Sequence, residues 1–124
     1  MGIVIAVLVG GAVGSLMRYV VAKTFQEWAG IEFPVGTLVV NLVGSFLIGL
    51  FYSWLVEGLA VPPQVRALLI TGFLGGLTTF STFSYESFYM LMNGELGKGI
   101  MYLLVTNGLG LLMVWAGYTL GRVV

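Results

Sequence analysis

The sequence contains no cysteine, no histidine and no aspartate. These absences exclude thiolate chemistry, a structural zinc site and a Ser-His-Asp triad. Charge is scarce as well, since five Lys and Arg residues and five glutamates make up 8% of the 124 residues and leave a net charge of zero. The chain therefore has no basic patch for nucleic acid, and its few glutamates suggest no acid-base pair for an enzyme.

Apolar residues, in contrast, make up 59% of the chain, and the mean hydropathy is +1.06. Soluble domains carry roughly 25% charged residues, so this composition indicates an integral membrane protein surrounded by lipid. Four segments are almost free of charge over the roughly 20 residues that a bilayer requires. They predict a single-domain, all-α membrane protein with spans at residues 3–22, 33–56, 64–92 and 99–121. The first is expected to be a retained span, because it lacks the basic start of a signal peptide.

The basic residues are divided almost evenly between the two sides of such a four-span topology. An even number of spans places Arg66 and Arg122 on the side of the termini, and Arg18, Lys23 and Lys98 on the other side. Membrane orientation follows the asymmetry of Lys and Arg, which is very small here. Either other features fix one orientation, or the chain inserts in both orientations, which would allow an antiparallel homodimer.

Small residues recur at the four-residue spacing that lets membrane helices pack closely. Because four helices enclose little interior, we expect some of these faces to pack within the chain and others against a second copy. The pairs are Gly10 with Gly14, Gly11 with Ser15, Thr106 with Gly110, and Gly117 with Gly121.

The third apolar segment is longer than a bilayer requires. Its 29 residues, 64–92, would form a helix roughly 43 Å long, against a hydrocarbon core of about 30 Å. The adjacent Gly75 and Gly76 offer a point of interruption, and the hydroxyl side chains that follow can satisfy freed backbone groups. We expect two half-helices with an irregular turn between Gly75 and Phe80; a kink that the hydroxyls merely fill is the alternative. A break at mid-membrane would expose carbonyls that suit a cation and amides that suit an anion.

Polar side chains recur every four residues in the second and fourth spans. Asn41 lies near the middle of the second span between Thr37 and Ser45, and Tyr102 and Thr106 repeat the spacing in the fourth span. A lone Asn is usually explained by an interhelical hydrogen bond, but its NH2 group can also donate to an anion. Two such stripes beside a broken helix predict a path through the protein.

The predicted path offers hydroxyl, amide and aromatic groups and no strong charge. Phe80 and Phe83 share one face of the second half-helix, and although such pairs often only pack, their ring edges carry positive potential. This lining suits a small, strongly hydrated anion. Arg18 is expected near one end of its span, extending to the interface. Glu86 is expected near the end of the third span, solvated or paired with a cation such as Arg18.

Five segments carry a resemblance to a known family: GFLGGLTTFSTFSYE, GTLVVNLVGSFLIG, GGAVGSLMRY, NGLGLL and GYTLGR. Together they extend over essentially the whole chain, and they resemble the Fluc family of microbial fluoride channels, also called CrcB. The resemblance implies a dual-topology antiparallel homodimer in the cell (plasma or inner) membrane, with two pores that passively export fluoride from the cytoplasm. It also implies a structural sodium ion at the dimer interface, bound by the backbone carbonyls of Gly75 and Thr78 from each subunit.

The resemblance also implies roles for individual residues. Phe80 and Phe83 would present ring edges to fluoride, and Asn41 would donate from its amide. The remaining positions would be the hydroxyl donors Ser81 and Thr82, the polar track of Thr37, Tyr102 and Thr106, and the structural Arg18. Gly110 departs from the pattern, because some members carry another hydroxyl there, and the far end of the track is therefore left open.

Two other functions share this size and charge. A small dual-topology multidrug transporter is expected to hold a glutamate in its first span, and residues 3–22 contain none. A non-transporting subunit of a larger complex is the third hypothesis. Functional reconstitution of the purified chain by itself distinguishes these possibilities.

Overall fold

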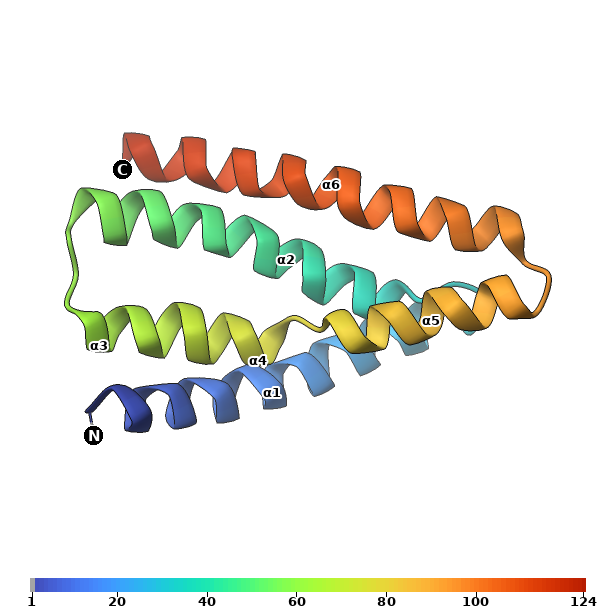
Figure 1. Ribbon diagram of the computed structural model, residues 1–124, viewed down its shortest axis with the longest axis horizontal. Helices are drawn as coiled ribbons and strands as arrows, with labels where there is room; N and C mark the ends of the chain where they lie inside the picture. Colours follow the sequence, from blue (N-terminus) through green and yellow to red (C-terminus); the bar gives the residue numbers. More distant parts are fainter. Residues whose placement is uncertain (1) are drawn as a thin grey trace.

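The computed structural model describes residues 2–124, which form four long helices lying side by side (Figure 1). All four are long and apolar enough to cross a membrane, which confirms the predicted all-α architecture. The turns of η1 and η2 are of the wider π type, and each continues the helix before it. The bounds are α1 Gly2–Ala29, α2 Val35–Phe51, η1 Tyr52–Gly58, α3 Pro63–Arg66, η2 Ala67–Leu74, α4 Gly75–Leu77, α5 Phe80–Met92 and α6 Leu96–Val123.

The first helix extends well beyond the segment expected from the sequence. It passes Lys23 and Glu27 and ends at Ala29, whereas the uncharged segment ends at residue 22. Long charged side chains can reach water from the ends of a membrane helix, so a charge does not mark the end of the helix itself. As a result, Arg18 lies well inside α1 rather than near its end.

Turn residues shape the connections, and one side chain ties the first of them together. Gly30 and Gly94 have φ of +89° and +79°, which glycine adopts without a steric penalty. Gln26 donates to the carbonyls of Gly30 and Phe33 and accepts from the backbone N–H of Gly36 at 3.0 Å. The start of α2 is thereby fixed to the last turns of α1.

Glycine allows the helices to pack in two close pairs, α1 with η2 and α4, and α2 with α6 (Figure 1). A Cβ at Gly10 or Gly14 would collide with the carbonyl oxygens of Leu68 and Phe73, and one at Gly117 with that of Phe46. These small residues therefore pack within the chain. The predicted pairs Gly10 with Gly14 and Gly117 with Gly121 give no support to a second copy.

The third span comes apart at Thr78 and Thr79, whose backbones are extended (φ −94°, ψ 159° and φ −148°, ψ 120°). The break lies within the predicted turn, but the prediction that the glycine pair forms it is wrong, because Gly75 and Gly76 are helical. Gly76 serves packing instead, since a Cβ there would lie 2.6 Å from the carbonyl oxygen of Gly11.

The buried apolar residues form two small clusters on either side of this break. Val40, Leu74 and Leu77 form one cluster, and Phe83, Met90 and Tyr102 form the other. Most other large apolar side chains are exposed, as expected where lipid or another membrane helix covers them.

Candidate functional site

Asn41 holds the broken backbone of the third span. Its Oδ1 accepts from the N–H of Thr79 at 2.8 Å, and its Nδ2 donates to the carbonyl of Thr79 at 3.1 Å. The side-chain amide thus replaces the backbone partners that Thr79 would have in a continuous helix. The prediction of an interhelical hydrogen bond for Asn41 is confirmed, and one hydrogen of its NH2 group remains.

Thr79 also begins the second half-helix. It is the N-cap of α5, and its hydroxyl accepts from the N–H of Thr82 at 3.2 Å. Threonine is a favoured N-cap because its side-chain oxygen satisfies an amide that lacks a helical partner. The threonine pair therefore ends one half-helix and starts the next.

Two carbonyls at the end of the first half-helix accept hydrogen bonds from side chains. Leu74 O accepts from both the N–H and the hydroxyl of Thr78 at 3.0 Å. Gly76 O accepts from the Arg18 Nε at 2.9 Å. Among residues 2–124, no hydrogen bond is found to the carbonyls of Gly75 or Thr78. The end of α4 therefore presents backbone oxygens and negative dipole ends beside a guanidinium group.

The position of Arg18 corrects a prediction. The sequence predicts an interfacial Arg18, yet its guanidinium contacts Gly76, near the middle of the 30-residue span Pro63–Met92. The cause is the extra length of α1, which places Arg18 deeper than an end at residue 22 would. The cation stabilises the free carbonyl end of a half-helix, where positive charge is favoured.

Glu86 joins both polar stripes in one cluster, and it does not pair with Arg18 as the sequence suggested. Its Oε2 accepts from the Thr37 hydroxyl at 3.0 Å and its Oε1 from the Tyr102 hydroxyl at 2.8 Å. Tyr102 is fully buried at 0% exposure. Glu86 lies one turn after Phe83 on the same face of α5, and that spacing is the signal that could have placed it in the site.

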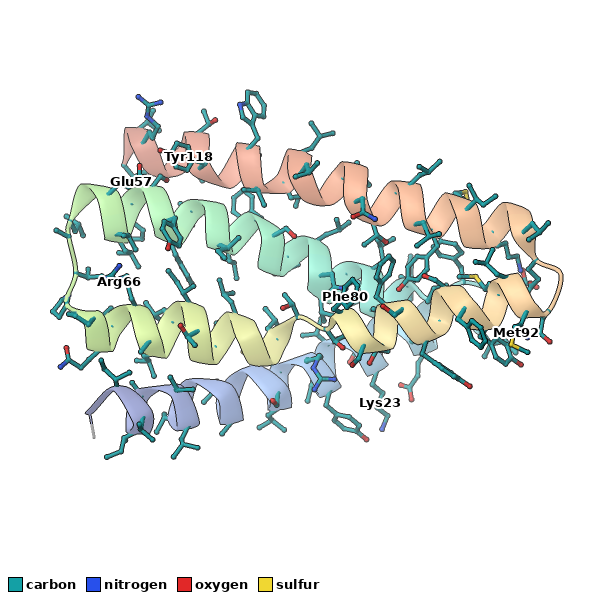
Figure 2. The ribbon with its side chains drawn as sticks, viewed as in Figure 1. Lys23, Glu57, Arg66, Phe80, Met92 and Tyr118 are labelled. Carbon is teal, nitrogen blue, oxygen red and sulfur yellow. The ribbon has the colours of Figure 1, made fainter. Side chains whose placement is uncertain are left out.

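Three aromatic rings pack edge to face beside this cluster. The ring centroids of Phe83 and Tyr102 are 5.0 Å apart at 65°, and those of Phe33 and Tyr102 are 5.4 Å apart at 81°. We call Phe33, Phe83 and Tyr102 the ring septum. The ring centroids of Phe80 and Phe83 are 6.1 Å apart. Phe80 lies at the break (Figure 2). It is 79% exposed, whereas Phe83 is only 7% exposed.

The ring septum contributes one ring to each of two cavities. A central cavity of about 550 Å³ is bounded by α2, α6 and the third span on both sides of its break, and its lining includes Asn41, Phe80, Phe83 and Thr106. A distal cavity of about 410 Å³ is lined by Phe33 and Glu86, among others. Phe83 lines the central cavity and Phe33 the distal one, and the Tyr102 ring packs between these two rings.

The structure brings most of the predicted site residues together. Thr106 lines the central cavity with a buried hydroxyl that has no hydrogen-bond partner among residues 2–124. Ser81 and Thr82, in contrast, are exposed on α5 and do not line the central cavity of this single chain. Their role as fluoride donors therefore stays a prediction.

The chemistry of the site is that of neutral donors. Amide, hydroxyl and aromatic side chains line the central cavity together with aliphatic ones, and no Lys, Arg or Glu does. Such groups can replace water around an anion without binding it as tightly as a positive charge would. Among residues 2–124 no cluster of three or more His, Cys, Asp or Glu could hold a metal, so any cation would depend on backbone oxygens.

Comparison with known proteins identifies the family of the chain. Residues 5–118 match a family model described as CrcB-like protein, Camphor Resistance (CrcB). A protein of Aquifex aeolicus named fluoride-specific ion channel FluC is 60% identical over 98% of both chains. Proteins of the same name from Hydrogenobaculum sp. and Thermus thermophilus are 49% and 47% identical, over 94% and 93% of this chain and 95% and 90% of theirs.

Proposed function

The chain belongs to the CrcB family, and on that premise we propose that it is a passive fluoride-selective channel exporting fluoride from the cytoplasm across the cell (plasma or inner) membrane. One observation carries the proposal at the level of the site. Neutral donors and two aromatic rings gather around a helix break that borders the central cavity. This is the lining that a small hydrated anion requires if it is to pass without being trapped.

Fluoride loses water in the central cavity and gains donors there. The free hydrogen of the Asn41 amide and the hydroxyl of Thr106 are neutral donors, and the edges of Phe80 and Phe83 carry positive potential. Because the side chains lining this cavity carry no full charge, the ion is stabilised but not held. Chloride is larger and more weakly hydrated, so it gains less from these compact neutral donors.

The hydroxyls of Thr37 and Tyr102 continue the path past the ring septum. In the structure both donate to Glu86, at 3.0 and 2.8 Å. An anion arriving at the septum competes with the carboxylate for these two donors. Thr37 and Tyr102 therefore serve as transferable donors, and Glu86 holds them in place between ions.

Backbone oxygens at the break fit a structural sodium ion. The carbonyls of Gly75 and Thr78 have no hydrogen-bond donor among residues 2–124, and free carbonyl ends of half-helices suit Na⁺. Two carbonyls from one chain are too few for a hard cation, so a second copy would complete the set. When bound, sodium would supply positive charge that fixes the two broken spans against each other.

Charge and exposure both support an antiparallel homodimer with two pores. With Arg18 bonded at the break, Arg66 and Arg122 on one side are balanced by Lys23 and Lys98 on the other, so the positive-inside rule favours neither orientation. Phe80 is 79% exposed, and Ser81 and Thr82 beside it are exposed as well. A second copy laid over the break would cover these residues and bring Ser81 and Thr82 to a pore.

The test is ion efflux from vesicles reconstituted with the purified chain alone. A fluoride electrode records release from fluoride-loaded vesicles, and a chloride electrode records chloride-loaded ones. We expect rapid fluoride release, chloride release at the rate of protein-free vesicles, and slower fluoride release after sodium is replaced by choline. Equal release of both anions would contradict the proposed selectivity. The multidrug transporter gains no support, since the glutamate that α1 carries, Glu27, is exposed in the last turn of that helix.

A further inference from the structure

A third cavity, of about 290 Å³, opens near the end of the molecule that holds both termini (Figure 1). It lies among α1, η1 and the start of the third span. Ile70 and Thr71 line both this cavity and the central one, so the two spaces adjoin. We call this third cavity the proximal mouth, because it leads from the end of the molecule toward the break.

The polar side chains of the proximal mouth are all donors. They are Arg66, Tyr52 and Thr71, and no carboxylate lines it. Glu57, from the nearby η1, accepts a hydrogen bond from Tyr118 of α6. Figure 2 shows Arg66 extending from α3 toward η1, while Glu57 and Tyr118 lie together toward α6.

Arg66 keeps its full positive charge available to this mouth. Residues 2–124 contain one salt bridge within 4.0 Å, between Lys98 and Glu95 at the opposite end of the molecule, and none that involves Arg66. The distal cavity has the opposite character, since Glu32, Glu86 and Glu95 line it and no Lys or Arg does. Lys98 pairs with Glu95 beside the distal cavity, so Glu32 and Glu86 set the negative charge there. The proximal mouth and the distal cavity therefore differ in the sign of their charge.

We propose that Arg66 is an anion-capture residue, which raises the local concentration of fluoride at the proximal mouth and so sets the rate of ion capture at low fluoride. The inference rests on the proposed function and extends the fluoride path to Arg66 and the proximal mouth. A charge beside low-dielectric walls attracts mobile anions through several ångströms of water, and salt screens this attraction. The screening length falls from about 30 Å at 0.01 M to about 10 Å at 0.1 M salt, so the effect must fade as salt rises.

The experiment compares Arg66→Gln, Arg66→Lys and Arg122→Gln with the unmodified chain. Arg122 is the matched control because it carries the same charge at the same end of the molecule and lines none of the three cavities. Each protein is reconstituted in uncharged phosphatidylcholine vesicles at constant sodium. Initial fluoride efflux is measured at low and at saturating fluoride, and ionic strength is varied with choline gluconate.

We expect Arg66→Gln to lower efflux roughly threefold at low fluoride and about 0.01 M ionic strength, which corresponds to an attraction of about one RT. The difference should disappear at about 0.3 M ionic strength and at saturating fluoride, where passage through the septum limits the rate. Arg66→Lys and Arg122→Gln should match the unmodified chain under all conditions.

Three results would overturn the inference. Equal rates for Arg66→Gln and Arg122→Gln at low ionic strength would leave Arg66 as an interfacial anchor for lipid only. A loss that persists at high salt and saturating fluoride would indicate fewer folded channels rather than slower capture. A lack of fluoride efflux from the unmodified chain would overturn the proposed function itself, and the inference with it.

Discussion

The two halves of the third span are held in different ways. The first half packs against α1 by direct backbone approach, with Gly10, Gly14 and Gly76 at the points of contact. The second half, α5, meets α2 and α6 through aromatic rings, hydroxyls and the Glu86 carboxylate. Two extended threonines separate them.

This difference teaches which half serves the fold and which serves conduction. Where the first half meets α1, the close backbone contacts leave no space between the helices, so this face acts as a fixed support. The second half gathers side chains that can turn or exchange hydrogen bonds, and it borders both cavities through Phe83 and Glu86. Substitutions where the first half meets α1 should therefore reduce folding, and those in the second half should reduce flux.

The largest effect is expected where α1 meets the first half. Gly14→Val places a branched side chain against the carbonyl of Phe73, which must move. Overpacking of this kind costs about 3 kcal/mol, and we expect most of the protein to aggregate during purification. Gly97→Val is the control, because a Cβ at Gly97 meets nothing within 4 Å. The yield from size-exclusion chromatography and the thermal midpoint are measured for both variants. Equal values for the two variants would contradict the close packing of α1 against the first half of the third span.

The next largest effect concerns the clamp across the break. Asn41→Ala removes both hydrogen bonds to Thr79 and leaves its N–H and carbonyl without partners, at a cost of about 2 kcal/mol. The thermal midpoint should fall and fluoride efflux should be lost. Asn107→Ala is the control, since Asn107 also lines the central cavity but donates only within its own helix, to Leu103. A fall in midpoint of the same size in both would show that Asn41 does not hold the break.

A smaller loss is expected from the guanidinium at the carbonyl end of α4. Arg18→Met keeps a long apolar stem but removes the donor to Gly76 O, at a cost of about 1.5 kcal/mol. Lys23→Met, in the same helix, removes a charge that points away from the bundle (Figure 2). We expect the thermal midpoint to fall for Arg18→Met and to stay unchanged for Lys23→Met. An unchanged midpoint for Arg18→Met would instead support the interfacial role predicted from the sequence.

The smallest effect on stability, paired with a clear effect on flux, is expected in the second half. Tyr102→Phe removes one hydrogen bond to Glu86 and costs about 1 kcal/mol. It should slow fluoride efflux, because one transferable donor is lost beside the septum. Tyr19→Phe, at an exposed position on α1 that lines none of the three cavities, should change neither quantity. A fluoride efflux rate for Tyr102→Phe equal to that of the unmodified chain would show that the Tyr102 hydroxyl takes no part in conduction.

The sequence was informative where local chemistry decides the structure. Long uncharged segments indicated the four membrane helices, and the four-residue spacing of Thr37, Asn41 and Ser45 indicated a polar face. That face does meet the third span, through Glu86 and Thr79. Excess length together with hydroxyl side chains also indicated that the third span is interrupted.

The errors arise where distant residues decide the outcome. The break falls at Thr79 rather than at the glycines, because Asn41, 38 residues away, takes the place of its backbone partners. Arg18 lies at the break because α1 continues past Lys23 and Glu27. Glu86 is held by hydroxyls from two other helices, and no pattern within α5 reveals those partners.

The most direct test of the central claim replaces the aromatic rings with smaller aliphatic side chains, which have no ring edge. Phe83→Ile and Phe80→Ile are each reconstituted, and initial fluoride efflux is measured beside the unmodified chain, with thermal midpoints as the check on folding. The account predicts that each variant loses at least about tenfold in fluoride efflux, equivalent to about 1.4 kcal/mol at the barrier, while both remain folded. Efflux at the unmodified rate from both variants would contradict it.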